Sequence, residues 1–267
     1  MFGARVINNV SGLGTTFIDP GLASRIAPWL YWFAFRSSAT IFFHNSDDLE
    51  LFLGRGIVRR DQARLLPGSG IDLDRFRPPD RAPRETGPFR FLLAGRLQWS
   101  EGIDQYVKAA RIVRRTYPDA VFQLLGEAGA NAMKAVPMAE VERWQAEGII
   151  DYLGSTNDVR DAIEHADCIV LPSYREGLPR ILLEGSAMGK PLIATDVPGC
   201  RDVVEPGVTG LLCPVRSADG LAAAMLEMAA LPATRRREMG AKGRQKVERQ
   251  FCESVVVERY LQAMDAA

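Results

Sequence analysis

Two glutamates flank a glycine and a proline in the segment SYREGLPRILLEGSAMGKPLIATDVPG, which runs from residue 173 to residue 199. Glu176 precedes a predicted helix, and Glu184 follows eight residues later, about one and a half turns inside that helix. The free N–H groups and the dipole of a helix start attract an anion, and Gly177 lets a phosphate approach the backbone closely. Glu184 is able to accept two hydrogen bonds from ribose hydroxyls, and Glu176 is able to bind hydroxyls of a sugar. A nucleotide-sugar accounts for both acids and for the glycine between them.

Each of these residues also has a simpler explanation. Glu176 alone is typical of an acid that stabilises the positive end of a helix dipole, and Glu184 alone is typical of an exposed helix residue. In the segment GRLQWSEG (95–102), Gly95 permits a close turn and Arg96 offers a planar fork for a phosphate or a carboxylate. Arg96 alone is also typical of a surface turn. We favour ligand binding because Arg96 and Glu176 both follow predicted strands, and Glu184 lies in the helix that begins next to Glu176.

Apolar runs alternate with helical patterns along the chain, which is typical of an α/β fold with a largely parallel sheet. Ligands of such sheets bind at the carboxyl ends of the strands. A helix is expected to begin at Ser46, with the serine hydroxyl as its cap. The segment 75–89 is rich in proline and charge and is predicted to be an interdomain linker. Strands are predicted at residues 4–10, 40–45, 63–70, 89–95, 121–126, 149–154, 167–173, 191–195 and 209–214.

The composition argues against two classes of protein. The 267 residues carry a formal net charge of zero, whereas a nucleic-acid-binding protein normally carries a basic excess. The four cysteines form no C-x-x-C pair and there are two histidines, so a Cys/His metal site is not expected. His44 and His165 are expected to be structural. The segment IAPWLYWFAF (26–35) is too short to span a bilayer; it is either a core helix, which we favour, or a helix that rests on a membrane surface.

Several segments, in order along the chain, resemble the family-4 group of retaining GT-B glycosyltransferases. Glu176 and Glu184 form the E-x7-E signature of that group, and the resemblance covers nearly the whole chain. NNVSGLGTTF and HNSDDLELF are most similar to bacterial enzymes of capsule, exopolysaccharide or O-antigen assembly. The other matching segments are GSGIDLDRFRP (68–78), AGRL (94–97), LLGE (124–127), DCIVLPSYREGLPRILLEGSAMGKPLIATDVPG (167–199) and EPGVTGLLCP (205–214).

This resemblance implies an α/β protein of the GT-B type. Residues 86–267 would form a Rossmann-like C-terminal domain with a parallel sheet, which binds the nucleotide-sugar. Residues 1–85 would form a partial, acceptor-side N-terminal Rossmann-like domain and the linker. The last helix is a candidate to pack back on the N-terminal part. The first strands of that domain and their glycine-rich loop are expected to be missing, and an open half-domain would expose apolar surface and favour self-association.

The resemblance also implies roles for single residues. Arg96 would bind the diphosphate and Glu176 the donor-sugar hydroxyls, and these two are the expected catalytic residues. Glu184 would bind the ribose, and the base would lie near residues 153–157. No metal and no other cofactor is implied, because cationic side chains stabilise the departing diphosphate. The expected donor-binding residues are Gly95, Arg96, Glu176, Gly177, Leu178 and Glu184.

The reaction expected from the resemblance moves a hexose or an N-acetylhexosamine from a nucleoside-diphosphate sugar, with UDP as the favoured nucleotide. The acceptor would be a lipid-linked saccharide, the anomeric configuration would be retained, and the product would serve cell-surface polysaccharide synthesis. The expected location is the cytoplasm, at the inner face of the plasma membrane, with peripheral membrane contact and no nucleic-acid partner.

One residue departs from the family pattern. The family usually has a lysine five residues after the arginine, and Glu101 stands at that position here. An anion beside a diphosphate is unfavourable, so either Lys108 or another cation compensates, or the donor site is weakened. The alternative is therefore a non-catalytic or degenerate nucleotide-sugar-binding fragment or subunit that needs a partner chain. A GT-B epimerase is disfavoured because neither histidine is well placed, and a phosphorylase because nothing suggests its pyridoxal-phosphate lysine.

Overall fold

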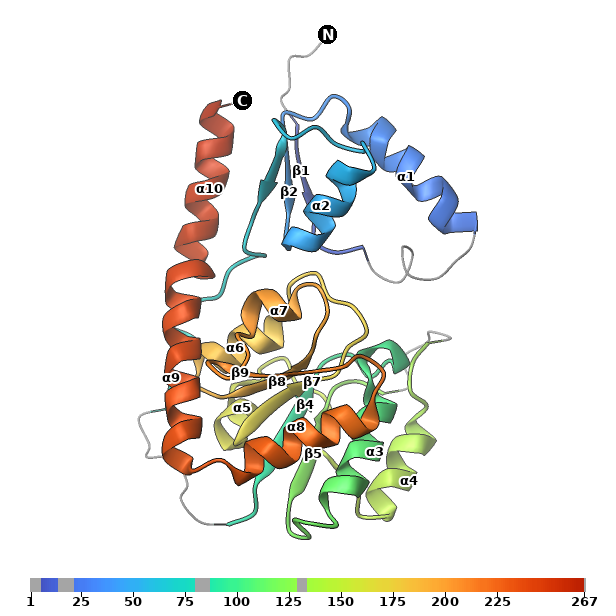
Figure 1. Ribbon diagram of the computed structural model, residues 1–267, viewed down its shortest axis with the longest axis vertical. Coiled ribbons are helices and arrows are strands. Elements are labelled where there is room, and N and C mark those ends of the chain that lie inside the picture. Colours follow the sequence, from blue (N-terminus) through green and yellow to red (C-terminus); the bar gives the residue numbers. More distant parts are fainter. Residues whose placement is uncertain (1–5, 14–21, 80–86, 129–133, 267) are drawn as a thin grey trace.

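The protein folds around two parallel β-sheets, which lie one above the other in Figure 1. The computed structural model describes residues 6–13, 22–79, 87–128 and 134–266. The smaller sheet has the strand order β1-β2-β3, and the larger sheet has the order β6-β5-β4-β7-β8-β9. Every neighbouring pair of strands in both sheets is parallel. The α/β class with parallel sheets, predicted from the sequence, is therefore confirmed.

The strands are short and the helices connect them in turn. The strands are β1 (Ile7–Val10), β2 (Thr40–Phe43), β3 (Ala63–Leu65), β4 (Arg90–Ala94), β5 (Val121–Leu125), β6 (Asp151–Tyr152), β7 (Cys168–Leu171), β8 (Leu192–Thr195) and β9 (Gly210–Cys213). The helices are α1 (Leu22–Phe35), α2 (Ser46–Gly54), the 3₁₀ helix η2 (Trp99–Glu101), α3 (Ile103–Val113), α4 (Met138–Ala146), α5 (Arg160–His165), α6 (Arg180–Ala187), α7 (Cys200–Val203), α8 (Ala218–Ala230), α9 (Ala233–Gln250) and α10 (Glu253–Ala266).

The larger sheet is covered by helices on both faces. In β4, Phe91 and Leu93 belong to the core shared with α3, α4 and α8, while Leu92 and Ala94 belong to the core shared with α5, α6 and α9. Successive side chains of a strand point to opposite faces, so a strand covered on both sides must be apolar at every position. This is why the apolar run at 89–95 predicts the strand so well.

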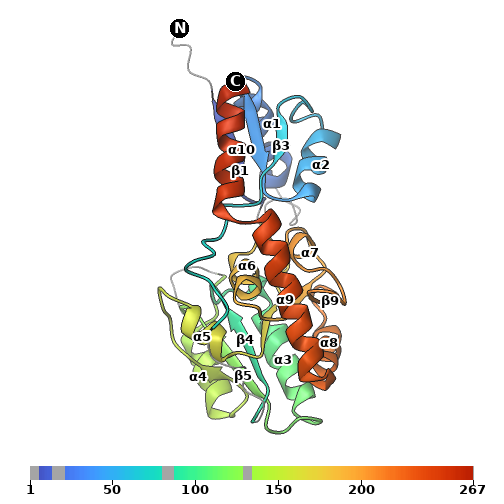
Figure 2. The same ribbon diagram turned by 90° about the vertical axis from the view of Figure 1, so that its left-hand side faces the viewer.

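The smaller sheet is sandwiched differently. Ile41 and Phe43 of β2 pack with α1 and α2, whereas Phe42 lies on the opposite face. The ring of Phe42 meets the ring of Tyr260 edge to face, with a centroid distance of 5.0 Å. Tyr260 belongs to α10, so the C-terminal helix runs back along the smaller sheet, as Figures 1 and 2 show.

Several local predictions need correction. Asn45, not Ser46, is the N-cap of α2: its backbone is extended, and its side-chain oxygen accepts a hydrogen bond from the N–H of Asp48. A cap residue must precede the first helical residue, and Ser46 is already helical. The strand predicted at 63–70 ends at Leu65, and η2, α4 and α7 were not predicted. Residues 14–17 of NNVSGLGTTF and residues 80–86 of the predicted linker lie outside the described residues.

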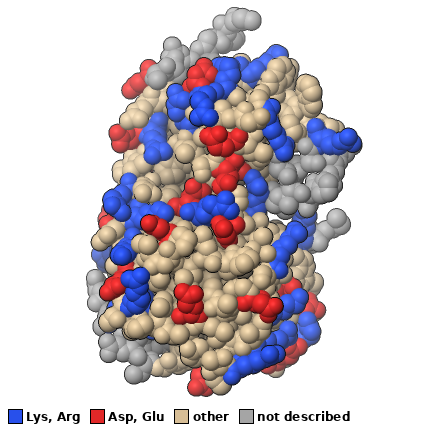
Figure 3. All heavy atoms as spheres, viewed as in Figure 1, with Lys and Arg blue, Asp and Glu red and all other residues tan. Residues whose placement is uncertain are grey.

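Among the described side chains of helix α1, those on one face pack on the smaller sheet and α2. Tyr31 and Phe35 contact Phe52 of α2, whereas 74% of Trp29 and 61% of Phe33 are exposed. The favoured prediction, a helix packed into the core, is therefore wrong for the face of α1 that carries Trp29 and Phe33. No helix in the described part of the chain is both long and apolar enough to cross a membrane. Acidic and basic side chains are interspersed over the face in Figure 3, in keeping with the zero net charge.

Candidate functional site

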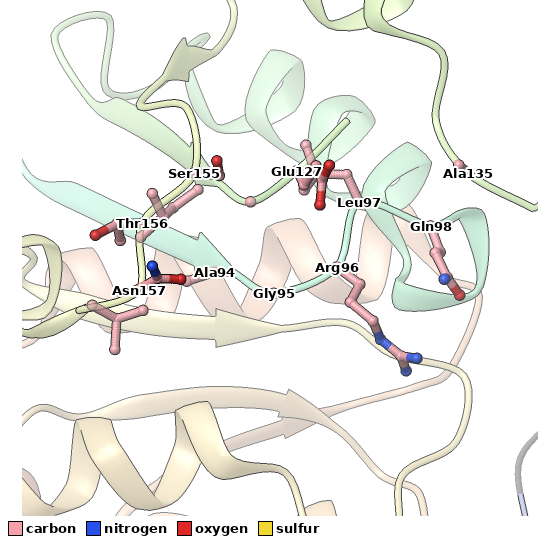
Figure 4. A pocket seen from close by; sticks show the side chains of 13 residues that line it. Ala94, Gly95, Arg96, Leu97, Gln98, Glu127, Ala135, Ser155, Thr156 and Asn157 are labelled. Carbon is pink, nitrogen blue, oxygen red and sulfur yellow. The ribbon is translucent and has the colours of Figure 1, made fainter. Parts of the chain in front are cut away.

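A pocket of about 580 Å³ opens at the carboxyl ends of β4, β5 and β6. The loop after β4 brings Arg96 and Gln98 to it, and the segment after β6 lies across from that loop with Thr156 and Asn157 (Figure 4). The pocket is lined by Ala94, Gly95, Arg96, Leu97, Gln98, Leu125, Gly126, Glu127, Ala135, Ser155, Thr156, Asn157 and Val159.

Backbone hydrogen bonds fix the loops around this pocket. The N–H of Gly95 donates to the carbonyl of Leu125 at 3.0 Å, and the N–H of Gly126 donates to the carbonyl of Gly154 at 2.8 Å. The three strand ends are therefore tied in series and present one wall. Residues 155–157, from the segment expected to hold the base, line the pocket, but Leu153 does not. Residues 129–133 of the small-residue loop after β5 lie outside the described part of the chain.

Glu184 is buried, unlike the exposed helix residue of the simpler explanation. Only 9% of it is accessible, and its Oε1 atom lies 3.5 Å from the Nε atom of Arg180, one turn earlier in α6. Burial raises the pKa of Glu184, and the neighbouring Arg180 opposes that shift. Arg180 was not singled out from the sequence, although its i,i+4 spacing from Glu184 could have indicated the pair.

Glu101, the residue in place of the family lysine, lies between Arg96 and Ser173 of the loop after β7. Its Oε1 atom is 3.3 Å from Nη2 of Arg96, and its Oε2 atom accepts a hydrogen bond of 2.7 Å from the hydroxyl of Ser173. The Lys108 ammonium, the cation considered as a substitute for the lysine, pairs with Asp104 of the same helix at 2.7 Å. The replacement therefore puts an acid in direct contact with the arginine expected to bind the diphosphate.

Glu176 lies beside Glu101. Burial and, next in size, the Glu101 carboxyl within hydrogen-bonding reach together raise the pKa of Glu176 to about 8, against the opposing effects of Ser173 and Arg96. Gly102 makes this approach possible: its φ is +76°, and a Cβ there would lie 2.1 Å from the carbonyl oxygen of Pro172. The loop after β4 and the loop after β7 are thus in close contact, and this contact brings Glu101 and Glu176 next to each other.

The loops of the smaller sheet reach the same place. A Cβ at Gly177 would lie 1.7 Å from the carbonyl oxygen of Ser11, so only glycine fits where the loop after β1 crosses the start of α6. The amide of Asn45 donates to the carbonyl of Gly177 at 2.9 Å. Asp48 of α2 pairs with Arg175, so both sheets contribute to the surroundings of Glu176.

Some residues around the site were not found by sequence reasoning. Ser11 and Asn45 follow predicted strands, so the rule that directs attention to strand ends could have found them. Leu178, just before α6, packs beside Gly68 and against the apolar core that α6 shares with α9. His44 has a lowered pKa because it is buried, and its Nε2 atom has no hydrogen-bond partner among the described residues. Within the described ranges, no group of three or more His, Cys, Asp or Glu side chains is arranged to hold a metal ion.

Comparisons with known proteins identify the family. The sequence model of the family described as "Glycosyl transferases group 1" matches residues 88–230. The chain is 25% identical over 270 residues to the N,N'-diacetylbacillosaminyl-diphospho-undecaprenol alpha-1,3-N-acetylgalactosaminyltransferase of Campylobacter jejuni, covering 96% of this chain and 69% of that enzyme. It is 32% identical over 208 residues to the glycogen synthase of Mycobacterium tuberculosis, covering 78% of this chain and 48% of that enzyme. The chain thus spans about half the length of the glycogen synthase.

The fold comparison agrees. The solved structure of Anabaena HepE in complex with UDP-glucose superposes with a TM-score of 0.82 at 16% identity, covering 98% of this chain and 72% of that one. The matched family segment, residues 88–230, includes β4 to β9 and the helices between them, with Arg96, Glu101, Glu176 and Glu184. The chain therefore belongs to the glycosyl transferases of group 1 and has the GT-B fold.

Proposed function

We propose that the protein transfers a hexose or an N-acetylhexosamine from a UDP-sugar to a lipid-linked saccharide, with retention of the anomeric configuration, in the synthesis of a cell-surface polysaccharide. The observation that carries the proposal is the pocket at the ends of β4, β5 and β6, with Arg96 at its edge and Glu184 buried in α6. The lipid-linked acceptor is supported by the Campylobacter relative, whose name gives a diphospho-undecaprenol.

In the proposed reaction the protein does not need to supply a covalent nucleophile. When the bond between the sugar and the diphosphate breaks, negative charge builds up on the departing oxygen, and a positioned cation stabilises it. In our proposal the cation is Arg96, whose side chain is 76% exposed and thus accessible from the pocket. Glu176 binds sugar hydroxyls, Gly177 and Leu178 contribute backbone groups, and Glu184 binds the ribose. The resulting donor site holds neither a metal nor an organic cofactor.

We also propose a division of labour within the chain. Residues 86–267 form the donor-binding domain, and residues 1–85 form the acceptor side and the linker, to which α10 returns. The exposed aromatic face of α1, flanked by Arg25 and Arg36, rests on the headgroup region of a membrane. This would keep a lipid-linked acceptor close to the cleft, with the protein at the cytoplasmic face of the membrane.

A second candidate function is nucleotide-sugar binding without transfer, as a subunit that needs a partner chain. It is favoured by one observation: Glu101 pairs with Arg96 and so reduces the positive charge available to a diphosphate. Turnover separates the two candidates. Release of UDP from a UDP-sugar in the presence of a lipid-linked acceptor supports transfer, and binding without release supports the subunit.

Calorimetric titration tests the donor site directly. UDP is the first nucleotide to try, because the structurally similar HepE was solved with UDP-glucose, and GDP is the comparison. We expect binding in the micromolar to millimolar range. Glu184→Gln should weaken UDP and UMP alike, by about tenfold or more, because hydrogen bonds to a charged group contribute about 1.5–3 kcal/mol. Arg96→Met should weaken UDP more than UMP, because the loss concerns the diphosphate.

Glu142→Gln is the matched control, since Glu142 is an exposed residue of α4 outside the pocket lining. It should bind UDP as the unmodified protein does. The proposal fails if the folded protein binds neither nucleotide, or if Glu184→Gln leaves the affinity for UDP unchanged.

A further inference from the structure

Glu101 changes the charge balance of the donor site. Only 13% of its side chain is exposed, and its two carboxyl oxygens contact Arg96 and Ser173. The Glu176 carboxyl lies within hydrogen-bonding reach of the Glu101 carboxyl. Two carboxyl groups therefore lie close to the guanidinium that, in the proposed function, binds the diphosphate.

Ionising both carboxyl groups there is unfavourable, because the two negative charges repel each other in a largely buried place. With both ionised, the three side chains of Arg96, Glu101 and Glu176 would carry one net negative charge, and an incoming diphosphate would be repelled. With one proton on the pair, the three side chains are neutral together and the guanidinium still faces solvent. Two carboxylates that share a site generally keep one proton for this reason.

We propose that Glu101 and Glu176 hold a single proton between them, and that the donor diphosphate binds only while that proton is present. This proton then supplies the positive charge that the lysine of the family pattern would supply. The inference rests on the proposed function of this site. Glu101 is a positioning residue in this scheme: it acts by keeping the proton on Glu176, which then donates a hydrogen bond to the donor instead of repelling it. No bond other than the one to the proton is made or broken.

The other groups around Glu176 are consistent with this arrangement. Arg96 and Ser173 favour its ionised form, while burial and Glu101 favour its protonated form and prevail, raising its pKa to about 8. Cys200 of α7 also faces Glu176, and the pKa of this thiol is raised by its burial and by Glu176 itself. From helix α2, beside the smaller sheet, Asp48 is paired with Arg175 and Asp47 is paired with Arg201 of α7.

The sign of the effect follows from the raised pKa. Below pH 7 the pair is protonated and binding is strong, and above pH 8 the proton leaves and binding weakens. If only the protonated pair binds, the binding-competent fraction falls from about 0.9 at pH 7 to about 0.1 at pH 9, so the Kd for UDP should rise about tenfold. The terminal phosphate of UDP ionises near pH 6, so it is already about nine-tenths ionised at pH 7 and contributes little to the change.

The test is calorimetric titration of the full chain with UDP at several values between pH 7 and pH 9, in buffers of different ionisation enthalpy. Besides the tenfold rise in Kd, we expect the protein to take up about one proton per UDP bound at pH 9 and almost none at pH 7. Glu176→Gln imitates the protonated carboxyl and should bind with the same Kd at both values. Glu101→Lys restores the family cation and should also remove the pH dependence, with tighter binding at pH 9.

Each outcome decides the matter. Binding of UDP that is independent of pH overturns the inference but leaves the proposed donor site intact. A pH dependence that persists in Glu176→Gln also overturns it, because the proton would then belong to another group. Failure of the unmodified protein and of Glu101→Lys to bind any nucleotide overturns the proposed function together with the inference. Proton uptake is measured on the unmodified chain, so the test stands even if a variant does not fold.

Discussion

Asp48 is fully buried at the start of α2, and its removal should destabilise the protein strongly. Its carboxylate pairs with Arg175, whose side chain is only 17% exposed, and also accepts a hydrogen bond of 3.0 Å from the amide of Asn45. The pair joins the smaller sheet to the loop before α6. Asp48→Ala would leave the guanidinium of Arg175 largely buried without its carboxylate.

The size of the loss follows from that burial. Removing one partner of a buried ion pair costs about 3–5 kcal/mol, because the other charge stays desolvated. Arg175 keeps some access to water, so we expect the lower end, about 3 kcal/mol. Removing both charges with Asp48→Ala and Arg175→Met together should cost less than Asp48→Ala alone, since no unpaired charge is left.

Urea unfolding followed by circular dichroism measures these differences, with the slope checked for each variant so that midpoints can be compared. The two single variants and the double variant complete a thermodynamic cycle. Glu142→Gln again serves as the control and should unfold as the unmodified protein does. The reasoning is refuted if Asp48→Ala loses less than about 1 kcal/mol, or if the double variant loses the sum of the two single losses.

Two further predictions concern α1 and the core. Exchanging the exposed Trp29 and Phe33 for serine should weaken binding to anionic phospholipid vesicles by about tenfold or more, because each aromatic side chain buried in the membrane contributes about 1.5–3 kcal/mol. Vesicle sedimentation measures this binding, and the melting temperature should stay the same. Equal sedimentation of the variant and the unmodified protein would contradict the proposed membrane contact. Tyr106→Phe should lower the free energy of unfolding, measured in urea, by about 1 kcal/mol, because the buried hydroxyl lies 3.0 Å from the carbonyl oxygen of Phe91 and 3.1 Å from that of Gln123. An unchanged midpoint would show that these contacts contribute nothing to stability.

Local sequence patterns determined much of the fold. The apolar run at 89–95 predicts β4 because a strand buried on both faces must be apolar at each position. The alternation of such runs with helical patterns predicts parallel sheets, and that in turn directs attention to the strand ends where Arg96 and Glu176 lie. Helix α4 was missed, although Val141 and Trp144 are buried at helical spacing, because its remaining residues are mostly polar.

Only the tertiary structure decided how the chemical groups combine. The spacing of Glu101 from Arg96 is visible in the sequence, but its contact with Glu176 depends on two loops from different strands meeting at Gly102 and Pro172. The pairing of Asp48 with Arg175 likewise joins residues that are far apart in the chain. Periodicity reports which face of an element is buried, whereas ionisation depends on the charges and the solvent within a few ångströms. Those neighbours are set by packing between elements, and a pattern along one chain segment does not encode them.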